Sequence, residues 1–117
     1  MYLFWFTWQS PVLDGRLRAF HTLDIPFAFD NTDRCAHMTG GGAEARDLAA
    51  KVSNAWISLA RNGDPNHGGL PKWPHFTAAK GETMIFDKKC EVKNDPDREE
   101  RRILESTNTW DILHSMP

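Results

Sequence analysis

The first apolar stretch of the chain is bulky, aromatic and uncharged. It runs from Tyr2 to Trp8, and only Thr7 interrupts it. A continuous apolar run of this length is typical of a strand covered on both faces, whereas a half-exposed strand alternates between apolar and polar residues. Pro11 is predicted to end it, because proline lacks the backbone N–H that a sheet ladder uses. We therefore expect a buried strand over residues 2–8.

A histidine follows this strand, among apolar neighbours. A turn at Asp14-Gly15 comes first, and His21 then stands between Phe20 and Leu23. In α/β sheets, catalytic groups lie just beyond the carboxyl ends of strands, so His21 is the first candidate for a site. Taken by itself, however, a histidine among apolar residues is more readily interpreted as a hydrogen-bonded residue of the core.

One stretch has clear helical periodicity. From Ala43 to Asn62, apolar residues recur at three- and four-residue steps, and Gly63 follows as a left-handed stop. We predict an amphipathic helix whose apolar stripe packs against the core. The preceding residues, Thr32 to Gly42, contain three consecutive glycines and no periodicity, so they are predicted to form a flexible loop.

The segment after the helix is rich in glycine and proline and is expected to be extended. Residues Leu70 to Pro74 can lay Trp73 over the helix. His67 and His75 lie in or beside this polar segment, where solvent-facing histidines are expected and metal ligands are not.

The last third of the chain predicts a second strand and a final helix. Thr83 to Phe86 forms the strand, which Cys90 to Val92 could extend past a lysine pair suited to a sheet edge. Asp95-Pro96 opens a helix over residues 97–106, with Ile103 and Leu104 on its apolar face. The tail Trp110 to Leu113 is apolar enough to dock.

Composition predicts one small globular domain over residues 1–117. The 117 residues are 40% hydrophobic and carry a formal net charge of −2 without long runs of either sign. Neither nucleic acid nor a membrane surface is therefore an expected partner. We identify no signal peptide and no apolar run long enough to span a bilayer, and the expected location is cytoplasmic.

The cysteines indicate no metal or redox site. Cys35 and Cys90 are far apart and form no CxxC, and Cys35-Ala36-His37 is too small a cluster for a tetrahedral metal site. Two free thiols without a role are favoured, and a disulfide between them stays an alternative. No cofactor is expected.

Five blocks of the chain resemble type-B carboxylesterases, the α/β-hydrolases that include cholinesterases and bacterial para-nitrobenzyl esterases. The blocks occur in the family's order and cover nearly the whole chain. They are YLFWF followed by FHTLDIPFAF, then NAWISLARNGDPN, LPKWP, TMIFD and the closing WD. Asp24 stands where glutamate is usual, which is a conservative change.

The resemblance implies the C-terminal piece of an α/β-hydrolase fold, here an α+β arrangement of a buried strand, a short second strand and two main helices with long loops. It also implies that His21 is the catalytic histidine of an ester hydrolase. Such enzymes place the serine in a Gly-x-Ser-x-Gly elbow, and serine and acid both precede the histidine. Only Ser10 and Asp14 are available before His21, and neither has the required context. None of the later serines has flanking glycines, so we predict no activity for the chain alone.

Two hypotheses follow from this. The chain is either the histidine-bearing piece of a carboxylesterase-like hydrolase, or a free-standing binding or assembly protein derived from such a piece. Leaving the strand at Tyr2 to Trp8 half covered would expose aromatic side chains and unpaired backbone groups. We therefore predict either a homo-oligomer, formed through that strand or the apolar loop around Phe27 and Phe29, or assembly with the remaining part of an esterase.

Overall fold

The computed structural model describes residues 1–107. The predicted docking of Trp110 to Leu113 lies outside the described residues. None of the helices within residues 1–107 has the length and apolar character required to cross a bilayer.

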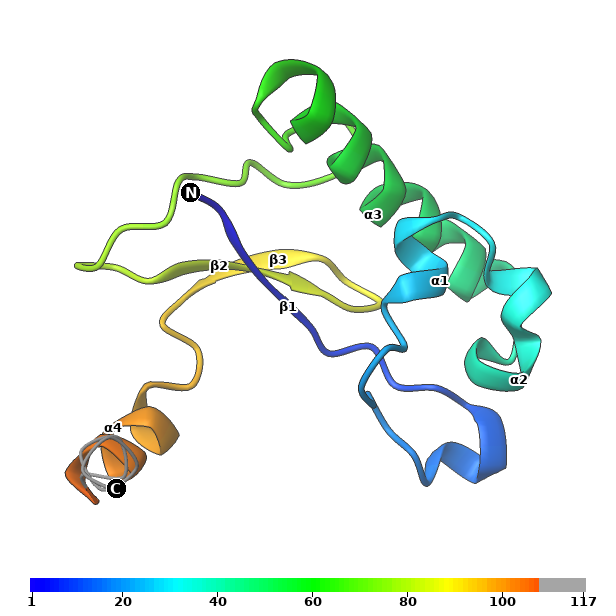
Figure 1. Cartoon of the computed structure of the whole chain (residues 1–117), viewed down its shortest axis with the longest axis horizontal. Helices are drawn as coiled ribbons and strands as arrows, with labels where there is room; N and C mark the ends of the chain where they lie inside the picture. The colour runs from blue at the N-terminus through cyan, green and yellow to red at the C-terminus, as the bar shows by residue number, and fades with distance from the viewer. Residues whose placement is uncertain (108–117) are drawn as a thin grey trace, which may run out of the picture.

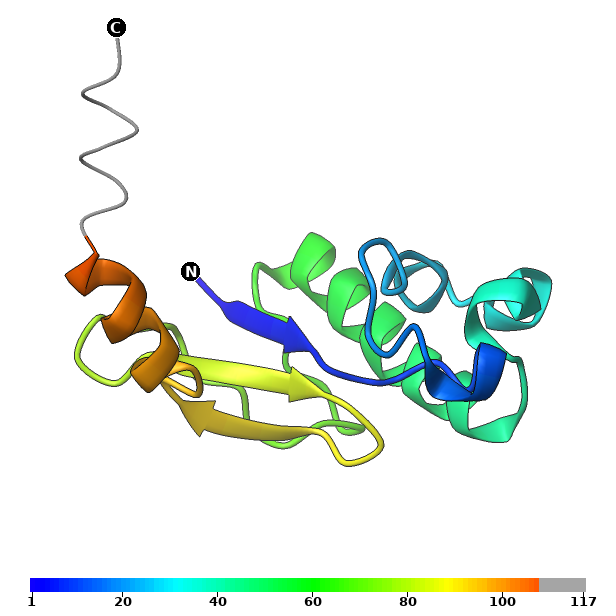
Figure 2. The same ribbon diagram turned by 90° about the horizontal axis from the view of Figure 1, so that it is seen from below.

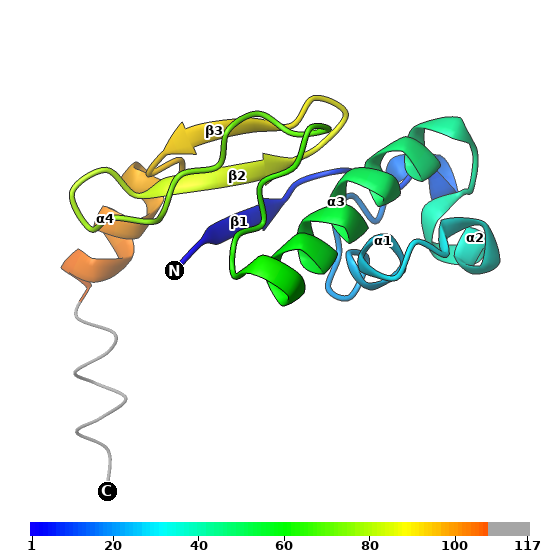
Figure 3. The same ribbon diagram turned by 90° about the horizontal axis from the view of Figure 1, so that it is seen from above.

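A three-stranded mixed sheet forms the centre of the molecule (Figures 1 and 3). Its strands, in the order in which they lie side by side, are β1 (Leu3–Phe6), β2 (Glu82–Phe86) and β3 (Glu91–Asn94). β1 runs parallel to β2, with Leu3 opposite Thr83, whereas β3 is antiparallel to β2. The expected α+β class is therefore confirmed. However, the residues around Val92 form a strand of their own, because the chain reverses direction between Phe86 and Glu91.

The prediction that the first strand is buried on both faces was wrong. Along β1 the exposure alternates: Phe4 and Phe6 are half-buried, whereas Leu3 and Trp5 are 42% and 46% exposed. The strand buried on both faces is β2, all of whose residues are buried. The reason is position, because within residues 1–107 β2 lies between two strands and β1 has one neighbour.

The long helix matches its prediction. Helix α3 spans Ala43–Asn62, and its C-terminal cap is Gly63 at φ 72°, whose N–H donates to the carbonyl of Leu59 over 2.8 Å. Its buried face contains small and aliphatic residues together with one serine, and α1 (Ile25–Ala28) packs closely against this helix. The residues of this face are Ala45, Leu48, Ala49, Val52, Ser53 and Ala55.

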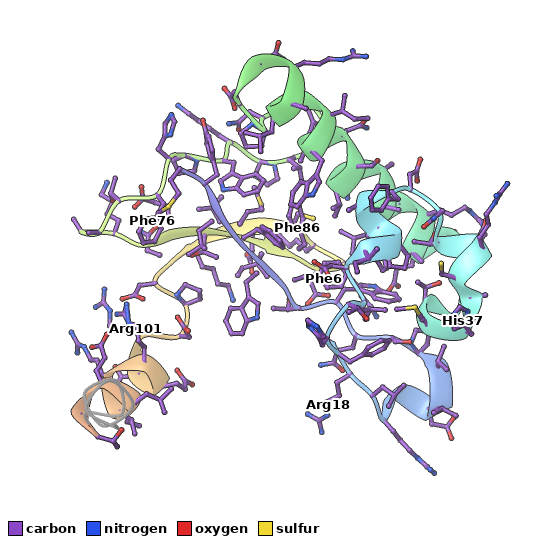
Figure 4. The ribbon with its side chains drawn as sticks, in the orientation of Figure 1. Phe6, Arg18, His37, Phe76, Phe86 and Arg101 are labelled. Carbon is purple, nitrogen blue, oxygen red and sulfur yellow. The ribbon has the colours of Figure 1, made fainter. Side chains whose placement is uncertain are left out.

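Aromatic rings fill the space between α3 and the sheet. Trp56 of α3 lies over the strands, with its ring centroid 5.0 Å from that of Phe4 and 6.1 Å from that of Phe86. Figure 4 shows Phe6 and Phe86 pointing into this interior. Trp73 was expected over the helix, but it stands edge-on to Phe86 and to Tyr2, at centroid distances of 5.6 and 5.8 Å. Trp73 therefore extends the aromatic layer along the strands.

The segment from Thr32 to Gly42 is more structured than predicted. It contains a 3-10 helix η2 (Thr32–Cys35) and a short helix α2 (Ala36–Thr39). The buried Thr39 hydroxyl donates to the carbonyl of Thr32 over 2.8 Å and so closes the two turns on each other. Gly40 is required, because it has φ 75° and a Cβ there would lie 2.7 Å from Cγ of Pro11.

The final helix begins slightly later than predicted and is exposed. α4 spans Arg98–Ser106, and none of its residues is buried; Ile103 is 65% exposed. The Asp95 side chain does not cap the backbone but accepts hydrogen bonds from the side chains of Arg98 and Arg101, at 3.1 and 2.7 Å. α4 lies at the end of the sheet away from α1 and α2 (Figures 1 and 2).

Candidate functional site

The candidate site is the loop that joins β1 to the short helix α1 (Ile25–Ala28) and carries His21. A 3-10 helix, η1 (Val12–Gly15), lies within this loop. In Figure 1 the loop leaves the carboxyl end of β1 and returns toward α3, so the histidine segment lies beyond the ends of the parallel strands. That is the edge at which α/β sheets bind ligands.

Ser10 anchors the start of this loop and is not free to act as a nucleophile. Its side chain is completely buried, donates to the carbonyl of Met38 over 2.5 Å and accepts from the N–H of Val12 over 3.2 Å. Its backbone N–H donates to the carbonyl of Arg18. The hydroxyl therefore ties the loop to α2, in agreement with the expectation that Ser10 is not the catalytic serine.

His21 itself is exposed, which contradicts the interpretation of a buried core histidine. Its neighbour in the turn, Leu23, is completely buried, and the N–H of Leu23 donates to the carbonyl of Phe20 over 3.1 Å. The apolar neighbours noted in the sequence thus hold the turn, while the imidazole is presented to solvent. Within residues 1–107, no hydrogen bond or ion pair to the His21 side chain is present.

Phe27 connects the histidine turn to the end of β1. It is completely buried, and its ring centroid lies 4.9 Å from that of Phe6 and 5.0 Å from that of Trp8. The indole N–H of Trp8 donates to a carboxylate oxygen of Glu44 over 2.9 Å, which adds a link to α3. Aromatic packing therefore holds the segment that carries His21 to the end of β1, and this hydrogen bond links the end of β1 to α3.

The backbone around His21 is strained. Thr22 has φ 76°, and β-branched residues rarely adopt a positive φ. Leu13, Asp14 and Arg18 of the same loop also have positive φ, and the Arg18 side chain points away from the body of the protein (Figure 4). The sequence reasoning missed this, because none of the four is glycine and no local pattern signals the conformation.

Asp24, which stands where the family usually has glutamate, follows His21 by three residues. In the structure it precedes α1, but its side chain makes no capping hydrogen bond. Its backbone carbonyl instead accepts the first hydrogen bonds of α1, from the N–H groups of Phe27 and Ala28 at 3.1 and 3.0 Å. The half-buried carboxylate therefore has no role in holding the turn.

The other described serines lie in helices and bond to backbone carbonyls. Ser53 donates to Ala50 and Ser106 to Ile103, while Ser58 contacts the carbonyls of Asp64 and Asn66. Ser115 is outside the described residues. Thus, in the part of the chain that the structure describes, His21 is not paired with a serine or a carboxylate.

His67, His75 and the two cysteines have structural surroundings. His67 is half-buried and bonds to the carbonyl of Lys51 and the N–H of Gly69, while the exposed His75 stacks on Tyr2 at 4.4 Å. Cys35 and Cys90 are unpaired, and burial raises the pKa of the Cys90 thiol, which keeps it protonated. Among residues 1–107, no three potential metal ligands cluster.

A shallow hollow of about 380 Å³ lies elsewhere, on the exposed face of the sheet. It is bounded by the aromatic Trp5, by Ile85 and by charged residues of both signs, including Lys88 and Glu91, and His21 is not part of it. The mixed charges favour no single class of ligand.

Comparisons with known proteins identify similar sequences, although no family model matches the chain. It is 38% identical over 91 residues to the phenmedipham hydrolase of Pseudarthrobacter oxydans, covering 74% of this chain and 18% of that protein. It is 31% identical over 106 residues to the para-nitrobenzyl esterase of Bacillus subtilis, covering 89% of this chain and 21% of that protein. The chain therefore spans about a fifth of the length of these relatives.

Solved structures of esterases are similar to this chain over the same share of their length. An esterase from Clostridium hathewayi that hydrolyses aliphatic aromatic polyesters superposes with a TM-score of 0.77 at 35% identity, over 84% of this chain and 19% of that one. A carboxylesterase from Geobacillus stearothermophilus gives 0.71 at 34% identity, over 86% and 21%. Most of this chain thus corresponds to a portion of larger esterase folds.

Proposed function

This chain belongs to the type-B carboxylesterase family, and we propose that it is the histidine-bearing part of a carboxylic ester hydrolase, with His21 as the general base. The observation that carries the proposal is the placement of His21. His21 is exposed in the loop that follows the carboxyl end of the parallel strand β1, while Leu23 and Phe27 of the same segment are completely buried.

The proposed role follows from the chemistry of acyl transfer. The imidazole accepts the proton of a serine hydroxyl as that hydroxyl attacks the ester carbonyl, and it then returns the proton to the leaving alcohol. A carboxylate holds the tautomer, and backbone N–H groups stabilise the oxyanion. The described serines, bonded to backbone carbonyls, supply no nucleophile for this step, so we expect the chain to need further residues for catalysis.

The first test is an assay of the purified chain with a para-nitrophenyl ester. We expect no turnover above background for the chain or for its His21→Ala variant, because proton transfer alone contributes only about 10²- to 10⁴-fold. Saturable hydrolysis that disappears in His21→Ala would contradict the proposed need for further residues.

The second test supplies those residues. The matching fifth of the Bacillus subtilis para-nitrobenzyl esterase is replaced by this chain, and hydrolysis of a para-nitrophenyl ester by the chimera is measured. We expect an active chimera in which His21→Ala lowers kcat by about 10⁴- to 10⁶-fold. His37→Ala is the matched control, since His37 is also exposed but lies in α2, and it should retain full activity. A folded chimera that is equally active with and without the His21 imidazole would refute the role of His21.

A further inference from the structure

The buried Trp8 lies where several elements meet, at the end of β1. Its backbone N–H and that of Thr7 both donate to the carbonyl of Phe86 in β2, over 3.2 and 3.0 Å. Only 2% of Trp8 is exposed, so its indole N–H requires an acceptor within the protein. That acceptor is a carboxylate oxygen of Glu44, in the first turn of α3, at 2.9 Å. Trp8 therefore joins the ends of two parallel strands to the start of α3.

The hydrogen bond between Trp8 and Glu44 holds the indole ring in one orientation. A hydrogen bond to an ionised acceptor is about twice as strong as one between neutral groups. The other oxygen of the Glu44 carboxylate lies 3.7 Å from the ammonium nitrogen of Lys88, but 74% of the Lys88 side chain is exposed, so solvent weakens this ion pair. Trp8 is therefore the stronger of these two partners of Glu44.

The indole ring of Trp8 packs against Phe27 and so contacts the segment that carries His21. The two ring centroids lie 5.0 Å apart, and Phe27 is completely buried. Three overlapping turns connect Phe27 back to His21, because the N–H groups of residues 23, 25 and 27 each donate to the carbonyl three positions earlier, over 3.1 Å. Residues 20–27 are thus tied together, and the position of His21 depends on that of Phe27.

We propose that Trp8 and Glu44 are positioning residues for His21. Their hydrogen bond keeps the indole against Phe27, and the turns that follow His21 then hold the imidazole where proton transfer requires it. Misplacing a reacting group by about 1 Å lowers a rate by as much as about 100-fold. The catalytic part of this inference rests on the proposed role of His21 as general base, whereas the structural part does not.

Hydrogen exchange of the full 117-residue chain tests the structural part without any ester. Glu44→Ala removes the acceptor and leaves every aromatic ring in place. We expect the N–H groups of residues 23, 25 and 27 to exchange about tenfold faster, because their turns open more often. The N–H of Gly63, at the far end of α3, should keep its exchange rate.

The matched control is Lys88→Ala, which removes the exposed partner of Glu44 and should leave all these exchange rates unchanged. Unchanged rates at residues 23–27 in Glu44→Ala would overturn the proposal. Equal acceleration at residues 23–27 and at Gly63 would overturn it as well, because the hydrogen bond would then stabilise the whole fold and not the segment of His21.

Kinetics of the para-nitrobenzyl esterase chimera test the catalytic part. We expect Glu44→Ala and Trp8→Phe each to lower kcat about 10- to 100-fold with KM unchanged, because the imidazole is displaced while ester binding is not altered. Glu44→Gln keeps an oxygen that accepts the indole N–H and should restore most of kcat. Combining Trp8→Phe with Glu44→Ala should lower kcat no further, since both changes remove the same hydrogen bond. Circular dichroism checks that each variant is folded.

The outcomes distinguish this inference from the proposed function. Unchanged kcat in Glu44→Ala, beside a strong loss in His21→Ala, refutes the positioning role alone. A loss in Lys88→Ala as large as that in Glu44→Ala also refutes it, because the indole N–H is then not the partner through which Glu44 acts. A chimera whose activity does not depend on His21 refutes the proposed function and, with it, the catalytic part of this inference.

Discussion

Phe27 lies against Phe6 with ring centroids 4.9 Å apart, and this contact joins the helix that follows His21 to the strand that precedes it. The two residues are separated by the whole histidine loop in sequence. The loop therefore depends on this contact for its attachment to the sheet.

Replacing Phe27 by alanine should be strongly destabilising. Removing a completely buried phenylalanine typically costs about 3–5 kcal/mol, because both the burial of the ring and its packing contacts are lost. Urea denaturation followed by circular dichroism measures the change. The matched control is Phe29→Ala, two residues away and 74% exposed, which should change the free energy of unfolding by no more than about 0.5 kcal/mol. Similar losses for both variants would contradict the anchoring role of Phe27.

Replacing Thr22 by glycine should stabilise the protein or leave it unchanged. Holding a residue with a side chain in the left-handed conformation costs about 1–2 kcal/mol of stability, and glycine removes this cost. Glycine also destabilises the fold by up to about 1 kcal/mol, because it gives the unfolded chain more conformational freedom. The expected net gain in the free energy of unfolding is about 0–1 kcal/mol. Thr22→Ala keeps a Cβ at φ 76° and should gain less. A destabilised Thr22→Gly variant would mean that the side chain contributes more than the strain costs.

Replacing Asn66 by alanine should loosen the segment after α3. The Asn66 amide accepts a hydrogen bond from the N–H of Trp73 over 2.6 Å and donates to its carbonyl over 2.8 Å. Both backbone groups of a buried residue would lose their partner, at a cost of about 1–3 kcal/mol each if they stay unsatisfied. Asn54→Ala is the control, since Asn54 is exposed on α3 and alanine favours helix. Tryptophan fluorescence during urea denaturation should show destabilisation of Asn66→Ala alone.

The protein should lose stability in acid as the carboxylate of Glu82 becomes protonated. The hydroxyl of Thr77 donates to its carboxylate over 2.5 Å and, as the largest cause, holds the pKa of Glu82 below its ordinary value of 4.5. A carboxylate whose folded pKa is lowered stabilises the protein above its ordinary pKa, and that stabilisation is lost as the pH falls through the folded value. The midpoint of urea unfolding should therefore fall as the pH drops below about 4.5. Thr77→Val should weaken this dependence, whereas Thr107→Val, far along the chain, should not alter it.

Helix α3 and the family blocks could be predicted from the sequence, because both depend on the order of residues that are close together in the chain. The three- and four-residue spacing of apolar residues gave α3 its correct limits at Ala43 and Asn62, and Gly63 could be assigned as its cap without knowledge of any neighbour. His21 was identified in the same way, by its place after a strand and within a family motif. Its catalytic role stays a prediction, as does oligomerisation.

Which faces of these elements are covered depends on the tertiary structure. The apolar run at residues 2–8 does not reveal how many neighbours its strand has, and Leu3 and Trp5 are exposed where, within residues 1–107, β1 pairs with β2 alone. Burial of β2 on both faces has the same origin. Likewise, the exposure of His21 depends on Leu23 and Phe27 taking the interior positions beside it. Local pattern determines which residues form an element, because backbone geometry repeats along the chain. Distant packing determines which face of that element is covered.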